Sequence, residues 1–374
     1  MNSVAPWHIK YHEELLHGRY ISPKKIEPLF HNLKKPFLIN TVGYSVENRP
    51  IHSVKIGKGD LKILMWSQMH GNESTTTKAI FDLFKALADP NAPEIFKQIV
   101  KNCSLCIIPQ LNPDGASAYT RNNAADIDLN RDAQLLSQPE SRVLREVFDD
   151  FQPDACFNLH GQRTIYGMSA TATPSIMSFL APAADSTRSI TLSRKRAMSA
   201  ITHINKELST ELYQHIGRYD DGFNINCTGD TFTSEGVPTI LFEAGHYPQD
   251  YEREKVRQLV FQAMITAISG LMGGLDYEPE DYFSIPEHEK CYCDVLIRNG
   301  AEGDIVIQFE EVLNNETIEF IPKVERIGSN EVVFGHRLID AKGQKVSHCD
   351  GSTLSIGDVL MELKINDDIT ITLS

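Results

Sequence analysis

The fold is decided by the stretch Lys62-Ile-Leu-Met-Trp-Ser-Gln-Met-His-Gly-Asn-Glu-Ser74. Its apolar run, Ile63 to Trp66, predicts a buried strand that stops at a turn containing Gly and Asn. Ser74 and the three threonines after it then open an amphipathic helix that reaches roughly Ala88. The stretch therefore predicts a strand, a tight turn and a helix, with the polar side chains gathered in the turn.

Two side chains in this turn have the spacing of a metal site. His70 and Glu73 stand at positions i and i+3, where the first turn of a helix can hold both toward one cation. An imidazole and a carboxylate form the mixed nitrogen and oxygen set that zinc accepts, and a third ligand would leave one position open for water. The competing interpretation is that both residues only cap the loop. Of the 13 histidines, only His70 has a glutamate three residues later, which favours the metal site.

Length and composition indicate a soluble globular protein with a large core. A chain of 374 residues predicts one large domain, or one large and one small. The net charge of −14 argues against a nucleic-acid partner, and no apolar run is long enough to predict a membrane partner. The N-terminal segment lacks the pattern of a secretory signal, and the seven cysteines have no regular spacing. We therefore expect a cytoplasmic protein.

Three further apolar runs predict buried strands that alternate with helices. They are Leu105 to Leu111, Ala155 to Leu159 and Pro238 to Phe242. Four such strands separated by helices predict an α/β fold, with an open mixed sheet covered by helices on both faces, over residues 1–276. Upstream, the alternating segment 41–57 predicts a pair of strands.

The rest of the chain is predicted to form loops and a second, smaller domain. Residues 162–192 and 217–235 are polar and are expected to be loops, the first long enough to line or cover a site. From about Tyr277 an acidic linker leads to short alternating runs, which predict a small β-rich accessory domain at 285–374. From Pro286 onward the chain carries 8 basic and 17 acidic residues, so most of the negative charge lies there.

Two other groups of ligand-type residues have simpler interpretations. Cys103 and Cys106 form a Cys-x-x-Cys pair, but no second pair stands at the spacing of a structural zinc site. His288, Cys291 and Cys293 could also bind a metal, although Cys-x-Cys side chains on a strand point to opposite faces. We predict core packing for the first pair and an incidental cluster for the second group.

The carboxyl ends of the predicted strands gather the remaining candidate residues. In open α/β sheets, ligands bind at that edge. One strand delivers His160 and another Glu243, while the loop after a third carries Arg121, Asn130 and Arg131. Several chemically competent groups at neighbouring strand ends predict a single active site.

The residue types assign the roles in this site. With His160, the pair His70 and Glu73 forms a His₂Glu set that predicts one zinc ion per chain. Zinc lowers the pKa of its bound water toward about 7 and polarises a carbonyl oxygen. Glu243, outside the metal shell, is the candidate general base that passes the water's proton to a leaving nitrogen. Arginine can hold a carboxylate or stabilise an oxyanion, so the set predicts hydrolysis of an amide near a free carboxylate.

The same residues stand in motifs that follow one another in a fixed order. His-Gly-Asn-Glu at 70–73 and Asn-Leu-His-Gly at 158–161 enclose a run, 121–131, that ends in Asp-Leu-Asn-Arg. Phe242-Glu243 ends the fourth strand. In this order they resemble the motifs of the zinc metallocarboxypeptidases of the funnelin type, the carboxypeptidase A-like family. The resemblance covers about residues 10–272 and includes the segments Gly43 to Ile51, Asn112 to Gly115 and Gln138 to Glu140.

The resemblance implies a fold and an activity. A member of this family would remove the C-terminal residue from a peptide or peptide-like substrate with a free carboxylate. Arg121 would polarise the scissile carbonyl, and Asn130 and Arg131 would bind the terminal carboxylate. Tyr219 stands near the spacing of the family's substrate-closing tyrosine, but its surroundings match poorly and its role is left open. The preferred terminal residue is not indicated.

Two alternatives remain open at this stage. An N-acyl amino acid deacylase or amidase would use the same zinc set, because an acylated amino acid also carries a carboxylate. A peptide-binding relative without turnover would keep the fold but usually lacks a ligand or the base. The pair Asn130 and Arg131 favours the peptidase over the deacylase, and the presence of all three ligands and Glu243 argues against the non-catalytic relative, so the peptidase is the leading interpretation.

Overall fold

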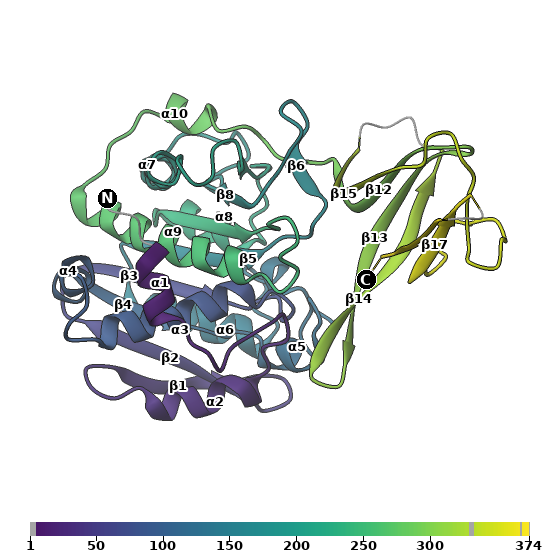
Figure 1. The fold of residues 1–374 in the computed structure, drawn as a ribbon. Helices are drawn as coiled ribbons and strands as arrows, with labels where there is room; N and C mark the ends of the chain where they lie inside the picture. Colours follow the sequence, from purple (N-terminus) through teal and green to yellow (C-terminus); the bar gives the residue numbers. More distant parts are fainter. Residues whose placement is uncertain (1–4, 329–332, 367–368, 374) are drawn as a thin grey trace.

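The computed structural model describes residues 5–328, 333–366 and 369–373. Figure 1 shows a large layered body with helices around a sheet, beside a smaller body made of strands. We call residues 5–285 the α/β unit and the described residues from 292 to 373 the β unit. The α/β unit contains an eight-stranded sheet in the order β1-β2-β4-β3-β5-β10-β8-β9. The predicted fold class is confirmed.

The four predicted apolar runs form the centre of this sheet. Their strands pair in parallel, β4 with β3, β3 with β5 and β5 with β10. The predicted pair upstream joins the same sheet, because β2 lies antiparallel to β4 and β1 to β2. The bounds are β1 Leu38–Tyr44, β2 Pro50–Gly57, β3 Leu61–Ser67, β4 Cys103–Ile108, β5 Ala155–Gly161 and β10 Thr239–Ala244.

The segment expected to be a loop at 162–192 contains strands, and that prediction is wrong there. β8 Met177–Leu180 pairs antiparallel with β10, and β9 Ile216–Arg218 extends the sheet beyond it. Four buried residues are too few to give a readable periodicity, so β8 is specified by its neighbours rather than by its own pattern. The same segment holds β6 Tyr166–Met168 and β7 Thr173–Pro174, which form a small sheet with β11 Glu289–Lys290.

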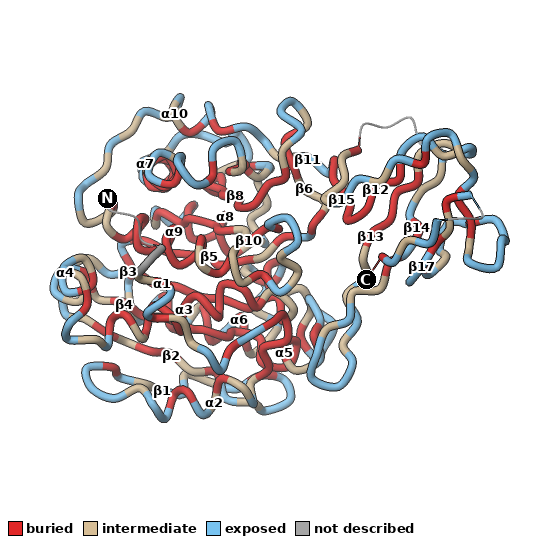
Figure 2. Tube along the Cα trace, in the orientation of Figure 1, coloured by how far each residue is buried: buried red, intermediate tan, exposed pale blue. Residues whose placement is uncertain are grey.

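Helices cover both faces of the sheet, as predicted. Along β3, Ile63 and Met65 pack into one apolar cluster while Leu64 and Trp66 pack into another, because successive side chains point to opposite faces. The central strands are accordingly buried along most of their length (Figure 2). None of the described helices is long and apolar enough to cross a membrane. The helices are α1 Ala5–Tyr11, α2 Pro23–Asn32, α3 Thr75–Ala88, α4 Glu94–Asn102, α5 Pro113–Ala118, α6 Pro139–Phe151, α7 Leu192–Glu207, α8 Thr228–Ser234, α9 Glu254–Gly273 and α10 Pro279–Phe283, with the 3₁₀ turn η1 Leu129–Arg131.

The predicted acidic linker is packed rather than free. α10 lies within it, and Tyr282 and Ile285 belong to the main apolar cluster of the α/β unit. The Tyr282 hydroxyl also accepts a hydrogen bond of 3.2 Å from the backbone N–H of Ala181. The second loop prediction, 217–235, is likewise interrupted by α8.

The β unit consists of two sheets. A four-stranded sheet has the order β14-β13-β12-β15, and a three-stranded sheet the order β16-β17-β18. The hairpin of β13 and β14 projects from the β unit toward the α/β unit (Figure 1). The bounds are β12 Tyr292–Gly300, β13 Gly303–Asn314, β14 Thr317–Ile327, β15 Phe334–Asp340, β16 Val346–Ser347, β17 Glu362–Ile365 and β18 Ile369–Thr372.

Candidate metal centre and active site

The turn after β3 is tightly packed and restricts which residues can occupy it. Gln68 has a positive φ of 44°, which turns the chain sharply after the strand. A Cβ on Gly71 would lie 1.9 Å from the carbonyl carbon of Gly115, so only glycine permits this approach. The backbone N–H of Glu73 then donates to the carbonyl oxygen of His70 at 3.1 Å. This tight turn brings both candidate ligands to the same side.

The three predicted metal ligands converge at the carboxyl ends of β3 and β5. The Nδ1 atoms of His70 and His160 lie 3.1 Å apart. Glu73 Oε1 lies 2.9 Å from His70 Nδ1, and its Oε2 lies 3.0 Å from His160 Nδ1. Among the residues that the structure describes, this is the one group of three or more histidine, cysteine or acidic side chains whose ligand atoms converge. Cys291 and Cys293 are buried free cysteines outside it.

The donor set fits zinc. Nitrogen and oxygen ligands lie about 2.0–2.2 Å from zinc, which spaces the corners of a tetrahedron roughly 3.3 Å apart. The separations of 2.9–3.1 Å are close to that value. The charges of His70 and His160 hold the pKa of Glu73 well below its usual value although burial opposes this, so its carboxylate is ionised. Glu73 Oε2 also accepts a 3.0 Å hydrogen bond from the backbone N–H of Gly161, which fixes its orientation.

Asp128 is a functional residue that the sequence analysis missed. Its Oδ1 lies 3.1 Å from His70 Nε2, so an N–H at Nε2 can donate to it and leave Nδ1 free to bind a metal. Its Oδ2 accepts two hydrogen bonds from Arg121, at 3.0 and 3.1 Å. Burial raises the pKa of Asp128, but the contacts with His70 and Arg121 outweigh it and hold the value low. The motif Asp-Leu-Asn-Arg contained this residue, and only its last two members received roles.

Glu243 lies beside the metal ligands without joining them. The register of β10 and β5 pairs Glu243 with His160 on neighbouring parallel strands. Its Oε2 is buried and has no hydrogen-bond partner among the described residues. Burial and the nearby charge of Glu73 hold the pKa of Glu243 well above its usual value. A carboxyl group in this position has a strong tendency to take up a proton.

One hollow of about 370 Å³ brings all seven predicted site residues together. We call it the metal hollow. Arg121 reaches the ligands, with its Nη1 3.1 Å from His70 Nδ1. Arg131 donates from Nη1 to the carbonyl oxygen of Asn130 at 2.7 Å. The side-chain oxygen of Asn130 accepts from the backbone N–H of Thr228, which leaves its amide N–H groups for a ligand.

Two more groups line the metal hollow. Tyr219, whose role the sequence left open, lines the hollow, and its hydroxyl lies 3.3 Å from that of Tyr166. Asp230 is only 6% exposed, and burial raises its pKa to about 6. It accepts a hydrogen bond from the backbone N–H of Asn224 but forms no ion pair with a described residue. Asp230 lies on α8, inside a predicted loop, so no sequence signal pointed to it.

Arg253 ties together the two strand ends that carry His160 and Glu243. It is 1% exposed, and burial lowers its pKa to about 10. Its Nη1 donates to the carbonyl oxygen of Ala244 at 2.7 Å, and its Nη2 donates to that of Gln162 at 3.0 Å. No sequence motif predicts a buried guanidinium that is bonded only to backbone oxygens.

Comparison with known protein families identifies the family of this chain. The family model described as Peptidase_M14, zinc carboxypeptidase, matches residues 32–236. This range covers more than half of the chain and includes the three candidate ligands, whereas Glu243 falls beyond its end. The protein belongs to the zinc carboxypeptidase family.

Individual relatives are distant. Carboxypeptidase SOL1 of Arabidopsis thaliana is 30% identical over 138 residues, which cover 32% of this chain and 28% of that protein. The match thus spans less than a third of that relative's length. Among solved structures, a metallo-carboxypeptidase from Burkholderia cenocepacia aligns with a TM-score of 0.56 at 18% identity, over 67% of this chain and 68% of that one. One from Pseudomonas aeruginosa aligns with a TM-score of 0.53 at 16% identity, over 67% and 69%. These likenesses establish the fold.

Proposed function

We propose that the protein is a zinc metallocarboxypeptidase that removes the C-terminal residue from peptides or peptide-like substrates. One observation carries the proposal. A converging His₂Glu set, a buried unpartnered carboxyl and a pair of carboxylate-binding side chains all line one hollow. Family membership supports the same conclusion.

The roles follow from these positions. His70, Glu73 and His160 hold the zinc ion, which when bound polarises the scissile carbonyl and lowers the pKa of a water molecule. Glu243 takes the water's proton and delivers it to the leaving nitrogen, a role that a raised pKa suits because proton transfer is most effective near the working pH. Arg121, beside the ligands, stabilises the negative charge that develops on the carbonyl oxygen.

Asn130 and Arg131 bind the terminal carboxylate of the substrate. The unused amide N–H groups of Asn130 and the guanidinium of Arg131 face the same hollow. Hydrogen bonds to charged groups contribute about 1.5–3 kcal/mol. A peptide amide, which lacks the charge, should therefore be hydrolysed at least about tenfold more slowly than its free acid.

Asp230 gives the site a preference for a basic terminal residue. Its buried carboxyl lacks an ion pair in the metal hollow, where a lysine or arginine side chain would supply the missing cation. The Pseudomonas aeruginosa structure is in complex with (2-guanidinoethylmercapto)succinic acid, a compound that carries a guanidine and carboxylic acids. Both kinds of group would find partners in this hollow, the guanidine at Asp230 and the carboxylates at Asn130 and Arg131.

Hydrolysis of matched peptides tests the proposal. The zinc-loaded protein should cleave a peptide ending in lysine, a chelator should abolish cleavage, and the amidated peptide should be the poorer substrate. His160→Ala should lower the bound zinc markedly from one ion per chain. Equal cleavage of free and amidated peptides contradicts the carboxypeptidase assignment. Cleavage of N-acyl amino acids without any cleavage of peptides would instead identify a zinc deacylase on the same scaffold.

A further inference from the structure

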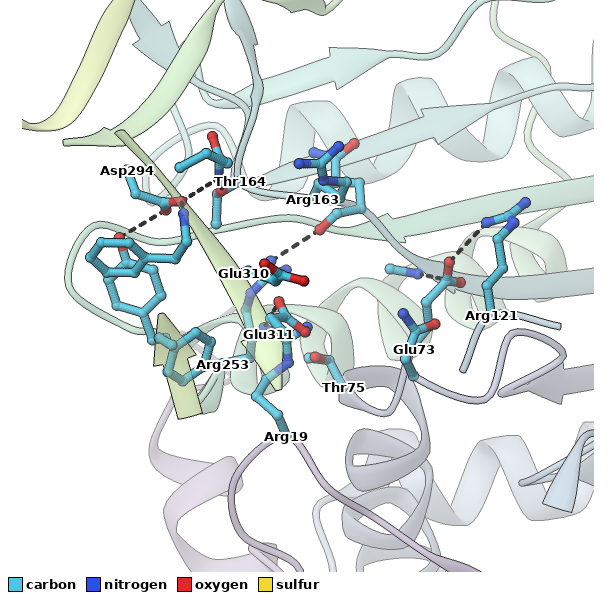
Figure 3. Close-up of a pocket in the computed structure, with 17 residues that line it drawn as sticks. Arg19, Glu73, Thr75, Arg121, Arg163, Thr164, Arg253, Asp294, Glu310 and Glu311 are labelled. Atoms are coloured by element: carbon cyan, nitrogen blue, oxygen red, sulfur yellow. Dashed lines mark hydrogen bonds and ion pairs between the residues drawn. The ribbon is translucent and has the colours of Figure 1, made fainter. Parts of the chain in front are cut away.

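The β13–β14 hairpin is fixed against the α/β unit beside the metal centre. Nη2 of Arg19 donates to the carboxylate of Glu311 at 3.0 Å, Nη1 lies 2.9 Å from the same carboxylate as an ion pair, and the Tyr119 hydroxyl also donates to this group. Gln308 donates from Nε2 to the hydroxyl oxygen of Thr164 at 2.6 Å. Figure 3 shows Glu311 and Arg19 facing each other on one side of a cavity that has Glu73 and Arg121 on the other.

The space between the hairpin and the α/β unit is a hollow of about 330 Å³, which we call the hairpin hollow. Glu73, Arg121 and Arg163 line both this hollow and the metal hollow, so the two adjoin each other. Asn130 and Arg131 line only the metal hollow. The hairpin hollow is therefore separate from the carboxylate-binding pair, although it reaches the metal ligand Glu73.

The chemistry of the cleft changes with distance from the metal centre. Its near part presents charged groups, including the exposed Arg163, which forms no ion pair with a described residue. Farther out, the rings of Phe309 and Phe320 each lie 5.1 Å from that of Tyr251. These three rings also line a third hollow of about 720 Å³.

The third hollow is lined by both apolar and polar residues. It carries Leu338, whose side chain is 63% exposed. Exposed apolar surface beside a cavity is typical of a binding site, because contact with a ligand removes that surface from water. The volumes of the two outer hollows fall in the range of ligand pockets, about 300–1,000 Å³.

We infer that the part of a peptide substrate on the N-terminal side of the scissile bond lies in this cleft, and that the rings of the hairpin and Leu338 select a bulky apolar side chain upstream of the cleaved bond. The inference rests on the proposed carboxypeptidase activity. Its basis is that the three hollows adjoin one another through shared lining residues and that the carboxylate-binding pair lines only the metal hollow. The β unit then takes part in substrate choice, although it supplies none of the metal or catalytic groups.

Two peptides that differ only upstream test this inference. The two peptides of a pair end in the same residues and differ at one upstream position, where one carries phenylalanine and the other glycine. The comparison is repeated for several upstream positions. The zinc-loaded full chain should show a kcat/KM at least about tenfold higher for phenylalanine at one of these positions, since burying such a side chain contributes about 1.5–3 kcal/mol. Phe320→Ala and Leu338→Asp should each reduce that ratio by about fivefold or more. Tyr213→Ala, an exposed aromatic residue that lines none of these hollows, serves as the matched control and should leave the ratio as it is.

The possible outcomes separate this inference from the proposed function. If the intact protein cleaves both peptides equally well at every position, the inference is wrong and the carboxypeptidase assignment stands. If it cleaves no peptide, both fail together. Retained zinc and an unchanged melting temperature establish that each variant is folded. Leu338 is exposed, so its variant carries the test even if Phe320→Ala does not fold, and an unchanged ratio in Leu338→Asp would then overturn the inference.

Discussion

The active-site cleft has two walls, one formed by the α/β unit (the α/β wall) and one by the β13–β14 hairpin (the hairpin wall). The two walls hold their side chains in opposite ways. On the α/β wall, His70 and His160 are each 2% exposed and are fixed by strand ends and by neighbouring carboxylates. On the hairpin wall, Phe309 and Phe320 are only partly buried and contact one ring, Tyr251. Buried groups keep one geometry, which bond breaking requires, whereas accessible groups can meet substrates of different shape. The difference suits the first wall to the proposed chemistry and the second to the inferred selection.

The largest effect should come from removing the base on the buried wall. Glu243→Gln keeps the shape but cannot accept a proton, so turnover should fall by about 10²-fold or more while zinc stays bound. Glu73→Gln should instead lower the zinc content. Kinetics on a lysine-ending peptide, together with metal analysis of both variants, checks this. Equal loss of metal from the two variants would show that Glu243 is a ligand.

A smaller effect is expected from the residue that positions the buried wall. Arg253→Lys keeps a positive charge but cannot bridge the carbonyl oxygens of Ala244 and Gln162 with two nitrogens. We expect kcat to fall about tenfold with KM little changed, because His160 and Glu243 lose their mutual alignment. A variant with normal kcat and a lower melting temperature would assign Arg253 to stability alone.

Asp230 tests selection within the metal hollow. Its raised pKa of about 6 means that it ionises as the pH rises through 6, so the preference for lysine over leucine at the terminus should grow across that range. Asp230→Asn should reduce the preference about tenfold at pH 7.5 and remove its pH dependence. Rates for paired peptides at pH 5.5 and 7.5 measure both effects.

Ionisation of Asp230, which should strengthen the preference for lysine, should at the same time lower the stability of the folded protein. Because its folded pKa lies above the usual value of 3.8, Asp230 contributes full stability at low pH and loses it as the pH rises toward 6. Asp230→Asn should therefore stabilise the protein at pH 7.5 by on the order of 2 kcal/mol and have little effect near pH 4. Denaturant unfolding at the two pH values checks the sign. A destabilised variant at pH 7.5 would mean that a cation already compensates the carboxylate.

The smallest effect concerns the anchor of the hairpin wall. Glu311→Gln weakens the ion pair with Arg19, which is largely buried. We expect a two- to fivefold loss of selection for an upstream apolar residue, on the order of 0.5–1 kcal/mol, while zinc binding is retained. Glu319→Gln, on the other strand of the same hairpin, is the control, because Glu319 is exposed and lines none of the three hollows. Loss of zinc from the Glu311 variant would show that the two walls are not independent.

The sequence predicted the chemical wall because its residues follow buried strands within short motifs. His70 and Glu73 share one turn, and the rule that ligands bind at the carboxyl ends of strands was enough to bring His160 to them. Asp230 could not be found in this way because it lies on α8, inside a segment predicted to be a loop, and Arg253 because its contact with Gln162 joins residues 91 positions apart.

The sequence also did not predict that the β13–β14 hairpin would lie beside the metal centre. The alternating pattern indicated strands in this part of the chain but not which surface they would face. The position of the wall depends on the contact of Glu311 with Arg19, residues separated by most of the sequence. Strand β8 was missed for a related reason, since its four residues take their place from β10.

The pairing of Glu243 with His160 also protects the sheet from misassembly. A slip of one residue between β10 and β5 would turn every side chain of β10 to the opposite face. Glu243 would then enter the layer where Phe242 now packs against Phe157 and Phe179. Placing a carboxyl among these rings is unfavourable by several kcal/mol, on the order of 2–7 for an unpaired polar group. The proposed catalytic base thus also selects the native alignment of the strands, so a chain that folds stably is one in which the base already stands beside the metal.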